Sequence, residues 1–279
     1  MKVLIEKIDN NFNNIKTDGL ILALKDYSIQ SIKYFSIEEI KEIVNKYDID
    51  IFVKINKNIF NKDLDKLKEI LIELNNINIK GIFFYDLSIL KLKQELNLDI
   101  NLVWDMTHMV TNSSSCNYYY DEGVKYALLS KELTVDEINK ISKNTKIKTI
   151  VELVSRSTIA FSKRKLLTSY NKINNYKNNN KLEVKEKVSN NNYIITESME
   201  GTSFYNKSIT NGLPFIDKLN NVEYIIIREY GIDNFNDLVN DIYNHLHNNK
   251  SLNIDKYNYL GDYHGFFDLE TIYKVKNNE

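Results

Sequence analysis

Residues 50–86 read DIFVKINKNIFNKDLDKLKEILIELNNINIKGIFFYD and contain one complete strand–helix–strand unit. The runs at 50–56 and 81–86 are short and rich in Ile, Val and Phe, which is typical of buried β-strands. Between them, residues 62–74 place Ile and Leu three and four positions apart with charged residues opposite, the pattern of a helix with one buried face. Two strands joined through a helix form a parallel pair. The stretch therefore predicts an α/β fold built on a parallel sheet.

The same kind of strand-like run recurs along the chain. The runs lie at 3–6, 19–24, 50–56, 81–86, 102–105, 126–130, 149–154 and 223–229. Helical patterns lie at 38–47, 62–74, 87–96, 134–143 and 236–248. Strands that alternate with helices in this number predict a TIM-barrel-like (β/α)8 fold. A doubly wound open sheet is the alternative that the pattern leaves open.

Composition limits the class of protein. The chain has 279 residues, of which 43% are hydrophobic, and this is enough for a sizeable core. Lys and Arg number 37 against 38 Asp and Glu, so the net charge of −1 gives no overall attraction to nucleic acid or to an anionic membrane. A single cysteine excludes an intramolecular disulfide framework and a protein-only four-thiolate cluster. No run approaches the length of a membrane span. These features predict a cytoplasmic protein without a membrane partner.

One segment interrupts the alternation of strands and helices. The part from 171 to 198 is rich in Asn, and LEVKEKV at 182–188 alternates like a half-exposed strand. This pattern predicts a β-hairpin inserted between the seventh and eighth barrel strands. Toward the end the helical period is lost, and the chain includes a strand-like TIYKVK at 271–276. We therefore expect a barrel over 1–250, including the hairpin, and a short β-containing tail over 251–279 that packs on it.

Polar side chains gather where the predicted strands end, and in a (β/α)8 barrel the catalytic groups stand at that end. The candidates for catalysis follow the fourth, fifth and sixth strands, and they are Asp86, Asp105, His108, Asn112 and Glu132. We expect them to share one pocket as acids, bases or hydrogen-bonding groups. Structural alternatives exist, because Asp86 and Asp105 also fit helix N-caps and a single His such as His108 is equally typical of a core or a cap.

The segment FSKRKLLTSY at 161–170 concentrates positive charge at the predicted mouth of the barrel. The candidates for binding substrate or RNA are Arg156, Ser162, Lys163, Arg164 and Lys165, together with Trp104. Arg and Lys bind phosphate and carboxylate through charge-assisted hydrogen bonds. A solvated basic helix start is the alternative. The sequence has no P-loop, no GxGxxG fingerprint and no zinc-type Cys/His spacing, and Ser162 has no neighbouring His, so we expect neither a metal site nor a serine triad.

Five segments, in order along the chain, resemble peptidase family U32, the collagenase-like peptidases. They are INKNIF at 55–60, IKGIFFYDLSILKL at 79–92, HMVTNSSSCNYYYDEGVKYALLSKELTVDEI at 108–138, FSKRKLLTSY at 161–170 and YHGFFDLETIYKVK at 263–276. The resemblance covers most of the chain from about residue 45 and is greatest to short members from low-GC Gram-positive bacteria. It implies a TIM-barrel-like fold.

Members similar to this sequence take part in hydroxylating the wobble uridine of tRNA to 5-hydroxyuridine, in a prephenate-dependent pathway. The resemblance thus implies tRNA as a partner and prephenate as a candidate co-substrate. Several long members hold an iron–sulfur cluster through cysteines, whereas this chain has only Cys116. We therefore expect no bound cluster, and a longer U32 paralogue becomes a candidate partner. A collagenase-like hydrolase and a non-catalytic scaffold remain alternatives, although the sequence offers a hydrolase neither an activated nucleophile nor a metal motif.

Overall fold

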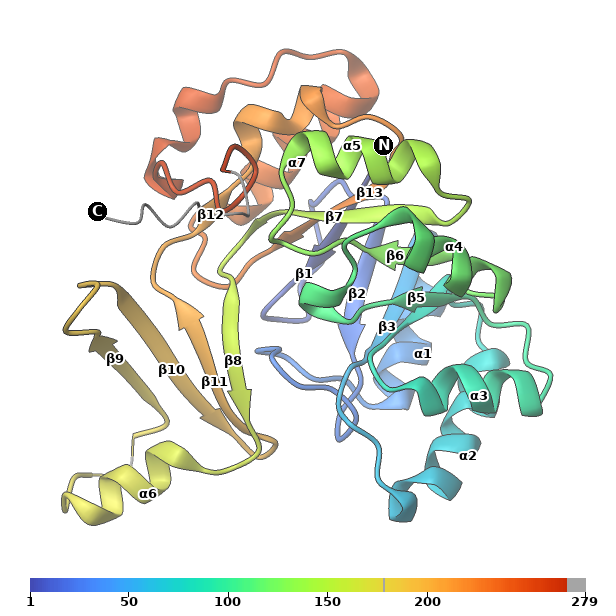
Figure 1. The fold of residues 1–279 in the computed structure, drawn as a ribbon, viewed down its shortest axis with the longest axis horizontal. Coiled ribbons are helices and arrows are strands. Elements are labelled where there is room, and N and C mark those ends of the chain that lie inside the picture. The colour runs from blue at the N-terminus through green and yellow to red at the C-terminus, as the bar shows by residue number, and fades with distance from the viewer. Residues whose placement is uncertain (178, 270–279) are drawn as a thin grey trace, which may run out of the picture.

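The computed structural model describes residues 1–177 and 179–269, and its main body is a closed barrel of parallel strands (Figure 1). The barrel strands are β1 (Lys2–Glu6), β2 (Gly19–Ala23), β3 (Asp50–Ile55), β4 (Gly81–Phe84), β5 (Leu102–Trp104), β6 (Tyr126–Leu128), β7 (Lys148–Ser155) and β13 (Val222–Arg228). Strand β13 pairs with both β1 and β7, and β6 pairs with β7, which closes the ring. Every predicted barrel strand is present. The (β/α)8 prediction is confirmed, and the open doubly wound sheet is wrong.

Helices cover the outside of the barrel. They are α1 (Ile37–Lys46), α2 (Leu64–Asn75), α3 (Leu87–Glu95), α4 (Ser113–Asp121), α5 (Val135–Asn144) and α7 (Phe235–Asn248), with 3₁₀ helices η1 (Asn61–Asp63), η2 (Thr107–Met109), η3 (Leu213–Lys218) and η4 (Ile254–Leu260). Ser36 and Thr134 begin α1 and α5 with complete capping boxes, which explains where these helices start. No helix in the two described ranges is long and apolar enough to cross a membrane.

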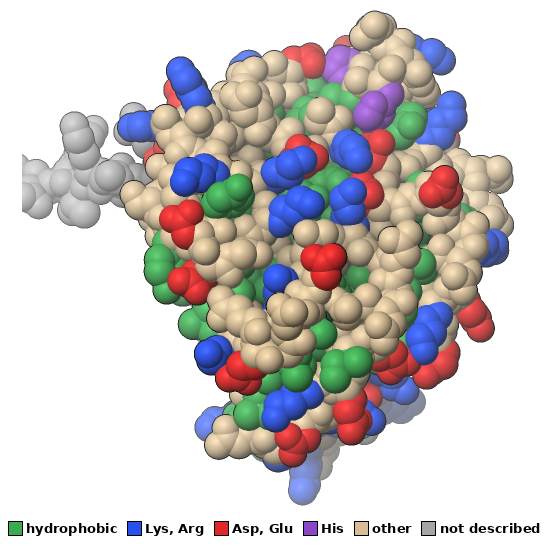
Figure 2. Space-filling view, turned by 90° about the vertical axis from the view of Figure 1, so that its right-hand side faces the viewer, with side chains coloured by type: hydrophobic (Ala, Val, Ile, Leu, Met, Phe, Trp, Pro, Cys, Tyr) green, Lys and Arg blue, Asp and Glu red, His purple; other side chains and the backbone are tan. Residues whose placement is uncertain are grey.

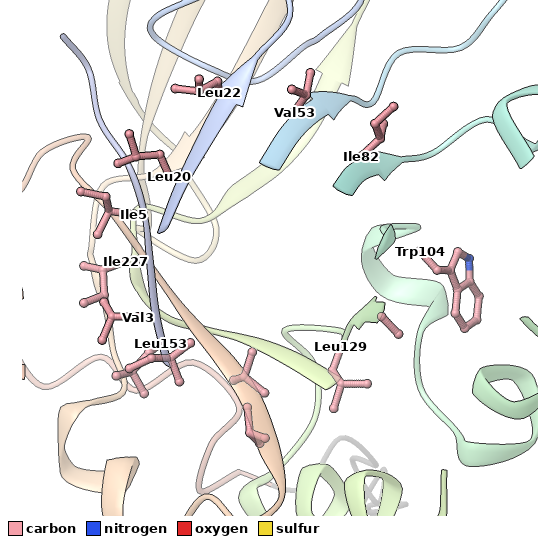
Figure 3. Packing of buried hydrophobic residues seen from close by; sticks show 14 of the residues in the cluster. Val3, Ile5, Leu20, Leu22, Val53, Ile82, Trp104, Leu129, Leu153 and Ile227 are labelled. Atoms are coloured by element: carbon pink, nitrogen blue, oxygen red, sulfur yellow. The ribbon is translucent and has the colours of Figure 1, made fainter. Parts of the chain in front are cut away.

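Apolar side chains form two cores, one inside the barrel and one between the barrel and its helices. Inside, the ring of Phe52 meets Phe83 and Tyr126 edge-on, with centroids 5.6 and 5.7 Å apart. Tyr224 approaches the same ring at 5.5 Å. Outside, the alternate residues of the same strands, such as Val53, belong to the larger core that Figure 3 shows in part. This alternation follows from the two-residue period of a strand, and it fixes which side chains point into the barrel.

Residues 156–209, which we call the insertion, form a separate four-stranded antiparallel sheet with one helix. Its elements are β8 (Thr158–Ser162), α6 (Leu166–Ile173), β9 (Lys181–Lys185), β10 (Asn192–Ser198) and β11 (Gly201–Asn206). The strand order is β8-β11-β10-β9, with β8 nearest the barrel and β9 farthest from it (Figure 1). Strand β12 (Thr210–Asn211) then returns to pair with β7.

The predicted hairpin is present as the antiparallel pair β9 and β10, but the inserted sheet is larger than the sequence predicted. Strands β8 and β11 extend it on the barrel side. The prediction missed β8 because its residues TIAFS follow β7 almost directly and are half-exposed or exposed, so they lack the alternation of a half-buried strand.

The chain after residue 250 lies against the barrel as far as the structure describes it. Tyr257 in η4 is buried, and the ring of Phe267 stacks on Phe215 with centroids 5.5 Å apart. The Val135 amide donates to the Phe267 carbonyl across 3.0 Å, so this segment also fixes the start of α5. The strand predicted at 271–276 lies outside the described residues.

Candidate functional site at the barrel mouth

The carboxyl ends of the barrel strands carry a layer of charged side chains. Strand residues two positions apart point to the same face, so a residue two positions after an inner-core residue also points into the barrel. The inner-core residues Leu4, Phe52, Val103, Ile150 and Ile226 are followed in this way by Glu6, Lys54, Asp105, Glu152 and Arg228. We call these five residues the charged layer. They lie on top of the apolar inner core, at the end of the barrel where this fold places its active sites.

Glu6 joins two cations of the charged layer. Lys54 Nζ lies 2.7 Å from Glu6 Oε1, and the Arg228 guanidinium contacts Glu6 Oε2. The Ser31 hydroxyl donates to Glu6 Oε1 across 2.6 Å. The side chain of Lys54 is only 3% exposed and that of Glu6 only 11%. Removing either partner would therefore leave a charge with little access to water.

Glu152 is the second anchored carboxylate. Arg228 Nε donates to Glu152 Oε2 across 2.7 Å, and Lys131 Nζ lies 2.6 Å from Glu152 Oε1. The Ser155 hydroxyl also donates to Oε1. Arg228 thus bridges the two glutamates, and burial lowers the pKa of its guanidinium to about 10. A guanidinium normally titrates so high that Arg228 stays charged at neutral pH.

Asp105 differs from the two glutamates because its carboxyl has no ion pair with any residue in the described ranges. It is buried, and burial raises its pKa while the charge of Lys54 and a hydrogen bond from the Thr107 backbone oppose the rise. Burial lowers the pKa of Lys54 to about 8, against the attraction of Asp105 and Glu152. An acid and a base whose pKa values move toward neutrality can exchange protons with a substrate near pH 7. The charged layer can therefore serve in general acid–base chemistry.

A cavity of about 740 Å³ opens directly above the charged layer. The loop between β2 and α1, at residues 29–32, forms one wall, and residues 158–161 of β8 form another. Tyr205 and Tyr230 line the side toward the insertion, with ring centroids 5.1 Å apart. This volume lies within the range of sites that hold small molecules.

The structure brings three of the five catalytic candidates to this cavity. Asp105, His108 and Glu132 line it, whereas Asp86 and Asn112 do not. Asp86 accepts hydrogen bonds from the Ser88 and Ile59 amides, both across 2.9 Å, and so caps α3. Asn112 accepts from the Ser115 amide across 2.8 Å and caps α4. For these two residues the observed contacts match the helix N-cap alternative.

The binding candidates are similarly divided. Arg156 and Lys163 line the cavity, whereas Ser162, Arg164 and Lys165 lie outside its lining. The Arg156 guanidinium donates to the carbonyls of Asn206, across 3.1 Å, and of Lys207, and it lies 5.6 Å from the Tyr230 ring centroid. It therefore links the insertion to the loop after β13.

Trp104 and the basic segment lie differently from the sequence expectation. Trp104 points out of the barrel, where its ring stacks on Tyr119 with centroids 4.0 Å apart (Figure 3). The run from Lys163 to Lys165 follows β8, at the end of a strand in the insertion rather than at the end of β7. Arg164 and Lys165 are exposed there.

Sequence reasoning did not select four members of the charged layer as site residues. They are Glu6, Lys54, Glu152 and Arg228. The signal that could have found them is a charged residue two positions after a large apolar residue, at the carboxyl end of a strand run. A charge in that position points into the barrel and must find a partner or a ligand.

The described residues do not offer the ligands for a metal or a cluster. No group of three or more His, Cys, Asp and Glu side chains within 1–177 and 179–269 is arranged to hold a metal ion. Cys116 lies in the outer core, and burial raises the pKa of its thiol to about 12. A single protonated thiol away from the cavity does not fit an iron–sulfur cluster, which needs several thiolates. That this chain binds no cluster stays a prediction.

A (β/α)8 barrel with a charged layer beneath a ligand-sized cavity is a common framework for a small-molecule or catalytic site. The sequence of residues 6–207 matches peptidase family U32, and the chain belongs to this family. The tRNA hydroxylation protein P2 of Bacillus subtilis (strain 168) is 26% identical over 227 residues, which are 78% of this chain and 71% of that protein.

Two further similarities are weaker. An uncharacterized protease of Methanocaldococcus jannaschii is 29% identical over 159 residues, which are 52% of this chain and 38% of that protein. Among solved structures, the C-terminal domain of a putative chitinase from Desulfitobacterium hafniense DCB-2 aligns with a TM-score of 0.38 and 10% identity, over 88% of this chain and 99% of that chain.

Proposed function

We propose that this chain takes part in tRNA hydroxylation, at the wobble uridine and with prephenate as co-substrate. The observation that carries the proposal is that two buried groups with pKa values shifted toward neutrality, Lys54 and Asp105, line the floor of one cavity of about 740 Å³. A cavity of this size takes a small molecule or a single base turned out of its stack. Similarity to the tRNA hydroxylation protein P2 supports the class of reaction.

The charge of the cavity lining supports an anionic co-substrate. The lining cations are Lys7, Lys54, Lys131, Arg156, Lys163 and Arg228, and the lining carboxyl groups are Glu6, Asp105, Glu132 and Glu152. The cations outnumber the carboxyl groups in a chain whose net charge is −1. A carboxylate such as that of prephenate would therefore find a favourable potential at the mouth.

In this proposal the side chains bind, orient and move protons. The protonated form of Asp105 is favoured by burial and can donate, while Lys54 can accept or return a proton. Lys131 is 40% exposed and can turn from Glu152 toward a ligand carboxylate. The oxidant comes from outside this set of side chains. We propose that a longer U32 paralogue supplies it in the cytoplasm.

A hydrolase has less support from the geometry. The Ser155 hydroxyl donates to Glu152, and the His108 ring is within hydrogen-bonding distance only of Thr107, at 3.4 Å, among the described residues. No serine of the cavity thus has a histidine partner in the described part of the chain. A non-catalytic scaffold is the remaining alternative, and it predicts that the charged layer can be altered without loss of function.

Mass spectrometry of tRNA nucleosides from a deletion strain tests the proposal. The strain should lose 5-hydroxyuridine, and the wild-type gene should restore it. Asp105→Asn should fail to restore it although the protein accumulates. Lys54→Met should also fail, and its protein level must be matched to the wild type because the variant removes one partner of the buried Glu6 carboxylate. Arg164→Ala should lower the modification with little change in thermal stability, because this side chain is exposed. Unchanged 5-hydroxyuridine in the deletion strain would refute the reaction, and full rescue by Asp105→Asn would favour the scaffold.

A further inference from the structure

The insertion has an excess of positive charge, unlike the rest of the chain. Residues 156–209 contain ten Lys and Arg against four Glu, in a chain whose net charge is −1. The barrel face on the side away from the insertion shows Lys and Arg interspersed with Asp and Glu (Figure 2). A module with an excess of positive charge on a chain of balanced charge is typical of a surface that meets a polyanion.

The cavity edge nearest the insertion has a particular structure, which we call the rim and define as Lys57, Phe60, Ile159 and Lys163. Lys57 and Phe60 belong to the loop between β3 and α2, whereas Ile159 and Lys163 belong to β8 and the turn after it. Ile159 and Lys163 line the cavity. The rim therefore spans the two parts of the molecule at the entrance to the charged layer.

Aromatic and cationic groups are paired at the rim. Lys163 Nζ lies 3.9 Å from the Phe60 ring centroid, within the range of a cation–π contact. Phe60 and Ile159 are each 52% exposed. Two large apolar side chains kept in water beside a cation form a surface on which a nucleobase can stack.

The two rim lysines lie close enough to repel each other. Burial lowers the pKa of Lys163, and the charge of Lys57 lowers it further. Lys163 has no ion pair with a described residue, and the nearest carboxylate oxygen to Lys57 is that of Glu200 at 3.9 Å. The charges of Asp63, Glu200 and Asp86 act on the pKa of Lys163 in the opposite direction, and Lys57 also donates to the Asp26 carbonyl. An anion bound between the two lysines would add to this attraction and relieve their mutual repulsion.

We propose that the rim binds single-stranded RNA, with a backbone phosphate between Lys57 and Lys163 and a base stacked on Phe60. This inference rests on the proposed function, and it names the surface through which the RNA reaches the cavity. The next nucleotide along the strand would pass Ile159 and place its base above Asp105. On the other side the strand would continue toward α6, where the exposed rings of Tyr170 and Tyr176 lie 5.9 Å apart.

Binding of a fluorescent anticodon stem-loop RNA to the full-length protein tests the rim. Lys57→Ala and Lys163→Ala should each weaken binding and lower the slope of log affinity against log salt by about 0.7, the value for one single-strand phosphate contact. Phe60→Leu keeps an apolar side chain but removes the ring, and it should weaken binding by roughly tenfold or more without changing the slope. A fully double-stranded RNA should bind without this dependence on Phe60.

Lys185→Ala and Lys187→Ala are the matched controls, because they remove the same charge from the exposed far edge of the insertion. They should leave affinity and salt slope nearly unchanged. If the controls weaken binding as much as the rim variants, bulk charge and not the rim binds RNA. If the rim variants bind normally but the deletion strain lacks 5-hydroxyuridine, the rim is wrong and the proposed function stands. Asp105→Asn should still bind RNA, so loss of chemistry is separable from loss of docking.

Discussion

The two ends of the barrel both carry ionic clusters, and the clusters differ in whether their charges are satisfied. At the amino end, Asp50 accepts from the Tyr224 hydroxyl at 2.7 Å, from Lys2 at 3.1 Å and from Lys80 at 3.0 Å. Burial acts to raise the pKa of Asp50, but these three hydrogen bonds hold it below its usual value. One carboxylate with three donors has no need of a ligand.

At the carboxyl end of the barrel, one carboxyl group has no ion pair with a described residue. Glu6 and Glu152 are held by Lys54, Lys131 and Arg228, but Asp105 is buried without an ion pair in the described chain and its pKa is raised. The cavity opens over this end. Similar residue types thus satisfy one another at the amino end of the barrel and leave one carboxyl group without an ion pair at the carboxyl end. The difference teaches that a buried carboxyl group without an ion pair next to a cavity, and not charge alone, marks the candidate functional end.

The largest effect should come from removing the carboxylate that holds the mouth together. Glu152→Ala leaves Arg228 and Lys131 without this partner, and the Glu152 side chain is only 2% exposed. We expect a loss of about 3–5 kcal/mol in the free energy of unfolding, the usual cost of breaking a buried ion pair. Urea denaturation measures it. The double variant Glu152→Ala, Arg228→Met should recover part of the loss, and a loss no larger than that of an exposed glutamate would contradict the comparison.

The next effect concerns the link between the mouth and the insertion. Gly231 has a φ of +78°, and a Cβ added there would clash with the Arg156 guanidinium. Gly231→Ala should therefore cost about 2–3 kcal/mol, through backbone strain and displacement of the guanidinium. Gly123→Ala is the matched control, because its φ is +88° and nothing lies within 4 Å of its added Cβ. The control should cost only about 1 kcal/mol. Thermal unfolding of both variants measures the two losses. Equal losses would mean that Arg156 moves freely.

A smaller effect is expected at the amino end. Asp50→Asn keeps an acceptor for Tyr224 but loses the charge that attracts Lys2 and Lys80. These lysine side chains are 43% and 34% exposed and can return to water, so the loss should be about 1–2 kcal/mol. Cells that carry this variant should keep normal 5-hydroxyuridine once protein levels are matched. A variant that is folded but lacks the modification would show that the amino end also serves the reaction.

The sequence predicts the barrel better than it predicts the insertion. The barrel strands are recognisable because runs such as residues 224–227 are apolar on both faces, as parallel strands between a core and helices must be. The start of α5 is recognisable because Thr134 and Glu137 satisfy each other locally. The insertion was underestimated because β8 and β11 are recognised by long-range pairing and not by their own pattern.

The site is harder to predict than the fold because it depends on distances between strands. The sequence places Asp86 and Asp105 in the same position, just after a strand, and both fit an N-cap. Only the structure separates them, since Asp86 accepts two backbone amides while Asp105 points into the barrel beneath the cavity. Glu6 and Arg228 are far apart in sequence, and their contact is set by the closure of β1 against β13.

The smallest expected effect is a difference between the wild type and Asp105→Asn in how the free energy of unfolding depends on pH. The pKa of this carboxyl is raised above the ordinary value of 3.8, mainly by burial, so the folded protein binds the proton more tightly than the unfolded chain does. Such a group contributes stability below the unfolded pKa, and the contribution is lost as the pH rises through the folded pKa.

Asp105→Asn cannot titrate. Its free energy of unfolding, relative to the wild type, should therefore increase from about pH 4 toward pH 7. Urea denaturation of both proteins across this range measures the difference, below the pH of about 8 at which Lys54 is half titrated. Parallel pH profiles would mean that Asp105 is as well satisfied as Asp50, and the contrast between the two ends of the barrel would then fail at the residue on which the proposed acid–base chemistry depends.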